Sequence, residues 1–398
     1  MRQTAAMNRS SPPTFAHAAP PAPPPSGAAA ASAPPAAPKV ELVYQLAAQR
    51  ERSALLRNPL LDLLQAVRHE GSISGAARRM GLSYRHVWGQ LKDWESTVGH
   101  ELIVWDRGQA ARLTPFADKL LWAERLAQAR LAPQIEALRA ELERALALVF
   151  DDQTQVLGLH ASHDDALASL QDLAAAQAGL HLDIQFTGSV DAIRALNEGR
   201  CLMAGFHTRQ QPLARTLTAR TYKPLLKPGR HKLIGFALRW VGLMVAPGNP
   251  LHLHTLADVA RTSARWVNRP TGTGTRVLLD ELLADAGLSP NDVNGYAHTQ
   301  PSHAAAAQAV ASGQADVGLG SESAARAAGL AFAPLLQERY QLVCLKTELD
   351  SAPVAALRRL LSSPAWTSAL QQLPGYMLDD SGQVKPMNRC LPWWAFKS

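Results

Sequence analysis

The sequence predicts a mixed fold: a small helical unit with a two-stranded hairpin, a long helix, and then a two-lobed α/β domain. Two short helical patterns flank one tight turn between residues 71 and 98. A leucine stripe then runs from 116 to about 150, and strand-like apolar runs alternate with helical patterns after 151. A chain of 398 residues, 47% of them hydrophobic and 18% charged, is long enough for two or three such domains.

Residues 71–98 have the pattern of a helix-turn-helix. Apolar and small residues recur at three- and four-residue spacing from Ile73 to Met80, which predicts the first helix. Gly81 predicts its end, because glycine readily adopts the left-handed conformation found there. An apolar stripe predicts the buried face of the second helix: Val87, Leu91, Trp94 and Val98. A helical hairpin inside an ordinary core is the alternative interpretation of this pattern.

The open face of the second helix carries side chains that suit nucleic-acid contacts. They lie at its N-terminal end and along one side: Ser83, Tyr84, Arg85, His86, Gly89 and Gln90. A strand at 102–105, a tight turn with Arg107 and a return strand with Arg112 follow, which is the pattern of a basic wing. The net charge of +7 also favours a polyanion. We therefore expect these eight residues to contact double-stranded DNA.

This segment resembles known DNA-binding domains. The run from Ile73 to Val98, followed by Arg107-Gly108 and by Leu113-Thr114-Pro115, resembles the winged helix-turn-helix of the molybdate-responsive repressor family. It is more distantly similar to LysR-type regulators. The resemblance implies a homodimer, or a homotetramer built from such dimers, that places recognition helices in successive major grooves.

The composition divides the N-terminal part into three segments. Residues 1–38 are rich in alanine and proline and predict a disordered tail, because they contain too little apolar surface to fold. Residues 39–115 form the predicted DNA-binding domain, with a supporting helix at 60–69. The leucine stripe of 116–150 predicts a long helix that either packs on its own domain or pairs with a second copy; the resembled families imply the second. Pro133 predicts a kink or a split.

Residues 151–398 predict the two-lobed domain, with lobe I at about 151–208 and 330–398 and lobe II at about 209–329. In lobe I, strands at 156–160, 182–186 and 202–206 alternate with helices, an order that predicts a parallel sheet. The strands expected in lobe II and on the return to lobe I are 265–268, 295–298, 315–319, 330–332 and 340–344.

Small polar residues follow the predicted strands, where ligands of open parallel sheets bind. The candidate ligand-binding residues are Ser162, His163, Ser189, Arg269, Thr271, Gly272, Thr273, Gly274, Thr275, Arg276, Ser302 and His303. The run from Thr271 to Arg276 is the sharpest pattern, because glycines allow close approach and a helix N-terminus follows. An anion is the expected ligand. The same run also suits an ordinary strand-to-helix turn.

The C-terminal part also resembles a known family. Residues 242–250, 267–269 with the GTGTR run, 309–320 and 338–340 resemble the periplasmic-binding-protein-like domain that is fused to helix-turn-helix units and to molybdopterin-pathway proteins. The resemblance implies a two-lobed sensor. Hydroxyl and backbone donors suit an oxyanion such as molybdate or tungstate, or a small carboxylate such as formate.

Other classes of function have less support in the sequence. The three cysteines, Cys201, Cys344 and Cys390, are too far apart for a CxxC metal site or a disulfide framework, so we expect no metal and a reducing cytoplasm. No apolar run is long enough to span a membrane, and prolines interrupt any signal peptide. We expect no cofactor. The sequence thus predicts a ligand-responsive one-component transcription regulator. The alternative is an enzyme or accessory protein of molybdenum-cofactor metabolism, with His163 and Asp164 as an acid–base pair.

Overall fold

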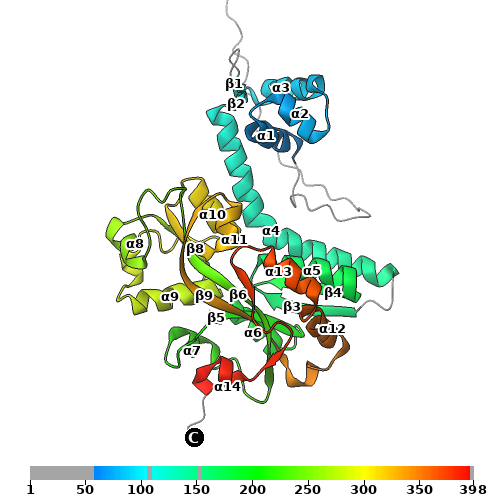
Figure 1. Cartoon of the computed structure of the whole chain (residues 1–398), viewed down its shortest axis with the longest axis vertical. Helices are drawn as coiled ribbons and strands as arrows, with labels where there is room; N and C mark the ends of the chain where they lie inside the picture. Colours follow the sequence, from blue (N-terminus) through cyan, green and yellow to red (C-terminus); the bar gives the residue numbers. More distant parts are fainter. Residues whose placement is uncertain (1–57, 105–109, 151–154, 395–398) are drawn as a thin grey trace, which may run out of the picture.

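The computed structural model describes residues 58–104, 110–150 and 155–394. The predicted tail of 1–38, the start of the DNA-binding domain and Arg107 of the wing lie outside these residues. A small helical head stands on one end of a long helix, and the other end of this helix lies along one side of a larger α/β domain (Figure 1). Among the described residues, no helix is long and apolar enough to cross a membrane.

The head consists of helices α1 (Pro59–Glu70), α2 (Ile73–Met80) and α3 (Tyr84–Val98) and a short antiparallel pair, β1 (Ile103–Val104) and β2 (Arg112–Leu113). Asn58 caps α1, and Gly81 ends α2 with a φ of 68°. Leu64, Val67, Val87 and Leu91 pack in its core together with Leu121 of the long helix. The helix-turn-helix and the two wing strands are therefore present as the sequence predicts.

Helix α4 (Pro115–Phe150) joins the head to the α/β domain. It is one continuous helix with Pro133 inside it, and it changes direction part-way along (Figure 1). A kink was one of the two predicted outcomes, and its cause is the missing N–H of proline. The leucine stripe divides between the two predicted roles: Leu121 and Leu126 are buried within the chain, whereas Leu131, Leu138 and Leu142 are exposed.

The α/β domain is built on one twisted sheet in the order β4-β3-β5-β9-β6-β8-β7. The strands at the lobe I end are parallel and alternate with helices as predicted: β3 (Gln155–Ala161), α5 (Asp165–Ala178), β4 (Leu180–Phe186), α6 (Ser189–Asn197) and β5 (Met203–Arg209). Lobe II contains α8 (Leu256–Thr262), β7 (Trp266–Val267), α9 (Gly274–Asp285), α10 (His303–Ala311), β8 (Val317–Ser321) and α11 (Glu322–Ala327).

Two long antiparallel strands, β6 (His231–Val245) and β9 (Ala331–Leu345), run through both lobes. The sequence predicts two separate strands, 330–332 and 340–344, where β9 is continuous. The residues between them pair with β6, and Glu338 among them is buried. The predicted strand 295–298 is wrong: Gly295 has a φ of 85° and this segment turns, with only one bridge, Asn268 to Thr299, against the sheet.

The boundary between the lobes also differs from the expected residue 209. Helix α7 (Leu217–Tyr222) packs in the lobe I core with α6, through Tyr222, Ala219 and Ile193. The crossing to lobe II therefore comes within β6. After β9 the chain completes lobe I with α12 (Ala352–Leu361), α13 (Pro364–Gln371), β10 (Tyr376–Leu378), β11 (Val384–Lys385) and α14 (Met387–Cys390).

Candidate functional site

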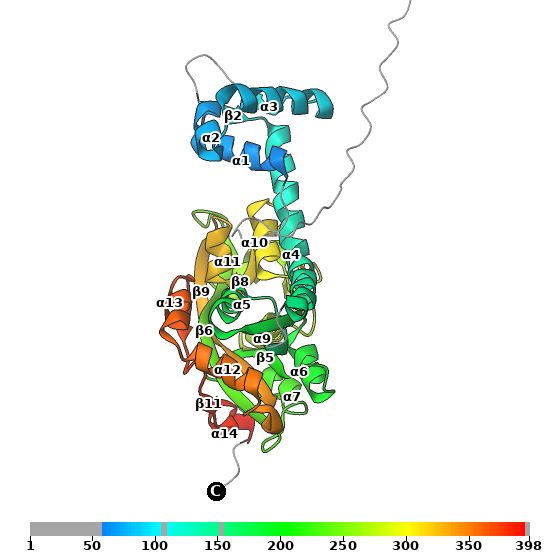
Figure 2. The same cartoon turned by 90° about the vertical axis from the view of Figure 1, so that its right-hand side faces the viewer.

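The predicted DNA-binding residues lie on one open surface of the head. Figure 2 shows α3 on the side of the head that faces away from the α/β domain. Ser83, Tyr84, Arg85 and His86 are exposed at its N-terminal end, Gly89 and Gln90 are half-buried beside them, and Arg112 is exposed on β2. Ser83 also has a structural role, because its Oγ accepts a hydrogen bond of 3.2 Å from the backbone N–H of His86.

The second candidate site is a small pocket between the two lobes, with a cavity volume of about 10 Å³, which is the space of about one water molecule. Lobe I contributes His163, Asp164, Asp165 and Tyr376, and lobe II contributes His303, Ala304 and Ser321. Arg239, from the part of β6 where its neighbours change from lobe I to lobe II, lies between these two sets.

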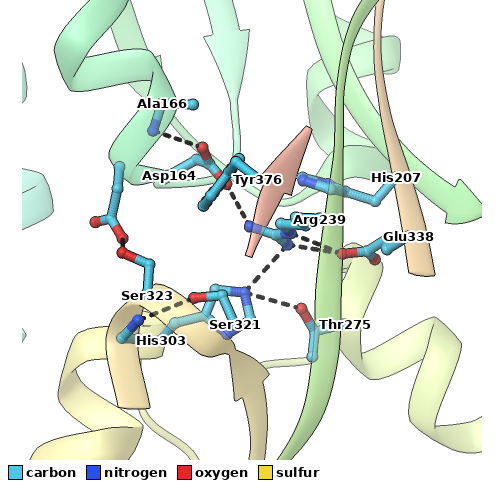
Figure 3. A network of polar contacts seen from close by, with 12 residues as sticks. Asp164, Ala166, His207, Arg239, Thr275, His303, Ser321, Ser323, Glu338 and Tyr376 are labelled. Atoms are coloured by element: carbon cyan, nitrogen blue, oxygen red, sulfur yellow. Dashed lines mark hydrogen bonds and ion pairs between the residues drawn. The ribbon is translucent and has the colours of Figure 1, made fainter. Parts of the chain in front are cut away.

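Arg239 is the centre of a buried charge network (Figure 3). Its guanidinium forms ion pairs with Asp164 of lobe I and with Glu338 of β9, the latter at 2.8 Å, and the Tyr376 hydroxyl donates to Asp164 at 2.9 Å. Burial raises the pKa of Asp164 and of Glu338, while Arg239 acts in the opposite direction. Because Arg239 pairs with both carboxylates, its positive charge is already balanced by side chains of the protein and is not available to a ligand.

Arg269 differs, because its side chain is only 3% exposed and its Nε and Nη1 atoms have no hydrogen-bond partner among the described residues. Burial, and then the positive charge of Arg239, lower the pKa of Arg269 to about 9. Its charge in turn influences the pKa values of His163, His207, His303 and Glu338, of which His163 and His303 line the pocket. A buried cation without a partner has a high desolvation cost, which an anion would offset.

Several other buried polar atoms in this part of the domain also have no hydrogen-bond partner. Within the described chain, the buried polar atoms near the pocket without a partner are Ser162 Oγ, His207 Nε2, His303 Nδ1 and Tyr340 OH. Burial first, and then the two arginines, hold the pKa of His207 and of His303 well below the ordinary value, so both rings are neutral. Arg239 donates to His303 Nε2 at 3.3 Å, which leaves the proton of His303 on Nδ1 as a free donor.

The GTGTR turn brings the two lobes into contact. Gly272 has a φ of 88°, and its carbonyl oxygen accepts a hydrogen bond of 3.3 Å from the backbone N–H of Val190 in lobe I. A Cβ on Gly274 would meet His207 Cβ at 2.9 Å and Ser189 Oγ at 3.1 Å. The Thr275 hydroxyl lies 3.3 Å from His303 Nε2. The structure thus shows the lobes closed on each other at this turn.

Several predicted ligand residues have other partners. Arg276 pairs with Asp280 at 3.2 Å, lies 4.0 Å from the ring centroid of Tyr296 and donates from Nη1 to the Arg269 carbonyl oxygen at 3.3 Å, so its guanidinium has partners within the protein. Thr271 is exposed, and Thr273 caps α9. Ser302 and His163 both contact the linker helix, through Ala129 and Glu136 respectively.

The acid–base pair of the alternative enzyme hypothesis is not present. Asp164 accepts from Arg239, Tyr376 and the backbone N–H of Ala166, whereas His163 pairs with Glu136 at 3.1 Å. The two side chains are neighbours in sequence but are held by different partners. No group of three or more His, Cys, Asp or Glu side chains in the described ranges is placed to hold a metal ion.

Sequence reasoning missed the residues that the two crossing strands supply, Arg239, Glu338 and Tyr340, and also Tyr376 near the C-terminus. A charged residue inside an apolar strand, as Arg239 is in HKLIGFALRWVGLMV, was the available signal. Nothing in the sequence pairs it with Glu338, which is 99 residues away.

Two family models match this chain. Residues 59–118 match the bacterial regulatory helix-turn-helix proteins of the LysR family, and residues 170–362 match the PBP superfamily domain. YvgK of Bacillus subtilis (strain 168), an uncharacterized protein, is 34% identical over 200 residues, which are 50% of this chain and 64% of YvgK. An uncharacterized protein from the 5′ region of a ferredoxin 2Fe-2S gene of Clostridium pasteurianum is 34% identical over 109 residues, 27% of this chain and 96% of that protein.

Several solved structures align with most of this chain at low sequence identity. Full-length BenM is 15% identical with a TM-score of 0.38, and the alignment covers 75% of this chain and 93% of BenM. A mutant OxyR of Corynebacterium glutamicum with bound H2O2 is 17% identical with a TM-score of 0.40, covering 78% and 94% of the two chains. Full-length CbnR in complex with its target DNA is 17% identical with a TM-score of 0.36, covering 78% and 98%.

Proposed function

We propose, from the premise that this chain belongs to the LysR-type regulators and carries a PBP superfamily domain, that it binds operator DNA as a homodimer and senses a small anion between its lobes. A ligand-responsive DNA-binding regulator is the function that the two family matches support together. The identity of the anion, the dimer and the individual contact residues are our proposal. Such a regulator acts in the cytoplasm.

The unpartnered guanidinium of Arg269 is the observation that carries the anion proposal. Its Nε and Nη1 atoms, Ser162 Oγ and His303 Nδ1 are buried donors without acceptors in the described structure. Buried polar groups in proteins are almost always hydrogen-bonded, so a set of donors around one cation indicates a missing acceptor. Formate, molybdate and tungstate are the anions we consider first, since each presents oxygen acceptors in a small volume.

The exposed surface of the head supports DNA binding. Arg85, His86 and Tyr84 project at the start of α3, where residues of a recognition helix reach the bases. We assign the dimer contact to the exposed leucines of α4, Leu131, Leu138 and Leu142, because large apolar side chains repeated along one helix are best buried against a second copy.

Isothermal titration calorimetry with formate, molybdate, tungstate and sulfate tests the sensor. We expect one of them to bind the wild-type chain and Arg269→Met to abolish its binding. Arg276→Met is the matched control, because Arg276 has its own partners in Asp280 and Tyr296. Equal binding by both variants, or no heat with any of the four anions, would contradict the assignment.

Fluorescence anisotropy with DNA from the gene's own upstream region tests the output. We expect salt-dependent binding that changes when the bound anion is added. No binding at low salt, with or without the anion, would contradict a regulator.

A further inference from the structure

The part of α4 between Ala129 and Ala140 is fixed to both lobes. On the lobe II side, the Ser302 hydroxyl donates to the Ala129 carbonyl at 3.1 Å, and Arg130 Nε donates to Gln300 Oε1 at 2.9 Å. On the lobe I side, Glu136 pairs with His163, and His181 Nε2 lies 2.9 Å from the Ala140 carbonyl. The helix that holds the head therefore bridges the two lobes.

Pro133 leaves one backbone carbonyl of α4, that of Ala129, free to accept a hydrogen bond from lobe II. In a regular helix the Ala129 carbonyl accepts the N–H of the residue four positions later, which here is a proline without one. The Ser302 hydroxyl takes that place. Ser302 also caps α10, and the first residue of α10 is His303, which lines the pocket. The N-terminus of α10 therefore lies next to both the bend in α4 and the pocket.

We propose that the bend of α4 at Pro133 follows the angle between the two lobes. Ser302 and Gln300 hold the helix before the proline to lobe II, and His163 holds the helix after it to lobe I. A change in the angle between the lobes then changes the bend and turns the head. The inference rests on the proposed sensor function and assigns Ser302 and His163 as positioning residues rather than anion ligands.

The contact between the lobes offers a way to open them without any ligand. A Cβ on Gly188 of lobe I would lie 2.7 Å from the carbonyl oxygen of Gly272 in lobe II, and a Cβ on Gly274 would lie 2.9 Å from His207 Cβ. Neither Gly188 nor Gly274 has a positive φ, so a larger residue there meets a steric clash and no backbone strain. Gly188→Val and Gly274→Val are therefore two independent wedges between the lobes.

Spin-label distances in the full-length chain test the proposal. The described native cysteines, Cys201, Cys344 and Cys390, are all buried, so introduced surface cysteines are labelled selectively. One pair, Ser96→Cys on α3 with Ala175→Cys on α5, reports the orientation of the head relative to lobe I, because the part of α4 that carries the head is held to lobe II. A second pair, Ala175→Cys on α5 with Ala257→Cys on α8, reports the opening of the lobes. Dilution with unlabelled chain removes distances between copies.

In the otherwise unchanged chain we expect each wedge to lengthen the cross-lobe distance and to shift the head distance beyond the width of its original distribution. Pro133→Ala restores an N–H that competes with Ser302 for the Ala129 carbonyl, and Ser302→Ala removes the donor. In either background the wedges should still open the lobes while the head distance loses its shift. Ser302→Thr keeps the hydroxyl and should retain the shift.

Two results would overturn the proposal: a head distance that follows the wedge equally in the Pro133→Ala chain, or a cross-lobe distance that neither wedge changes. The experiment needs neither DNA nor an anion. If the anion titration fails and the wedge experiment succeeds, the effector assignment is rejected and the coupling through Pro133 is retained. If the titration succeeds and the wedge experiment fails, the coupling is rejected and the effector assignment is retained.

Discussion

The recognition surface of the head and the pocket between the lobes carry their charges in opposite ways. Arg85 is exposed on α3, so its charge is hydrated in the free protein. Arg239 is 2% exposed and its charge is balanced inside the protein by Asp164 and Glu338. The difference predicts that charges of the head determine affinity and hardly affect folding, whereas charges of the pocket determine folding first.

The largest expected effect is that of Arg239→Met. The substitution leaves Asp164 and Glu338 buried without their cation, and removal of one partner of such a pair typically costs about 3–5 kcal/mol of folding free energy. Urea unfolding followed by circular dichroism measures it. Arg265→Met is the control, because the pair of Arg265 with Asp316 is exposed to solvent and should contribute much less. Similar losses for both variants would remove the contrast between buried and exposed charge.

Arg85→Ala should have the next largest effect, on DNA binding. If the guanidinium reads a base, the loss is about 1–3 kcal/mol for the cognate sequence; a phosphate contact would weaken all sequences alike and reduce the salt slope by about one. Anisotropy at several salt concentrations separates the two. Arg326→Ala, on the α/β domain and paired with Glu322, should leave DNA affinity unchanged.

Ser83→Ala tests whether a residue of the recognition surface also supports folding. Loss of the cap on α3 should reduce the free energy of unfolding by about 1 kcal/mol. Ser83→Asn keeps a capping oxygen and should recover most of that stability. An unfolding midpoint of the alanine variant equal to that of the wild type would show that the cap contributes nothing in solution.

The smallest expected effect is a pH dependence that links α4 to lobe I. Burial lowers the pKa of His163, but the hydrogen bond and the charge of Glu136 more than offset it, so the pKa is raised above 6.5 in the folded chain. The pair therefore stabilises the fold fully below pH 6.5, and its contribution is lost as pH rises through the raised pKa. Unfolding free energies measured across this range should fall more steeply with pH for the wild type than for Glu136→Gln. Parallel curves would show that the pair does not titrate as described.

The head was predictable because its signals are local. Gly81, Ser83 and the stripe from Val87 to Val98 each act within one turn of their own helix, and the structure places the ends of α2 where the spacing predicts. In lobe I, the alternation of strands and helices likewise determines a parallel sheet. The turn at 295–298 was mispredicted because its residues are compatible with a strand. Gly295 has a positive φ and lies so close to the Trp266 backbone that a side chain would not fit there.

The sequence by itself determined the order of the parts, the helix-turn-helix with its capping residues, and the presence of a two-lobed α/β domain. Only the tertiary structure decided which of two nearby arginines has a carboxylate partner. Arg269 and Arg276 stand seven residues apart in the same turn, and only the fold gives Arg276 the carboxylate of Asp280 while it buries Arg269 without one. Hydrogen-bond satisfaction depends on neighbours brought from distant strands, and sequence spacing does not contain that information.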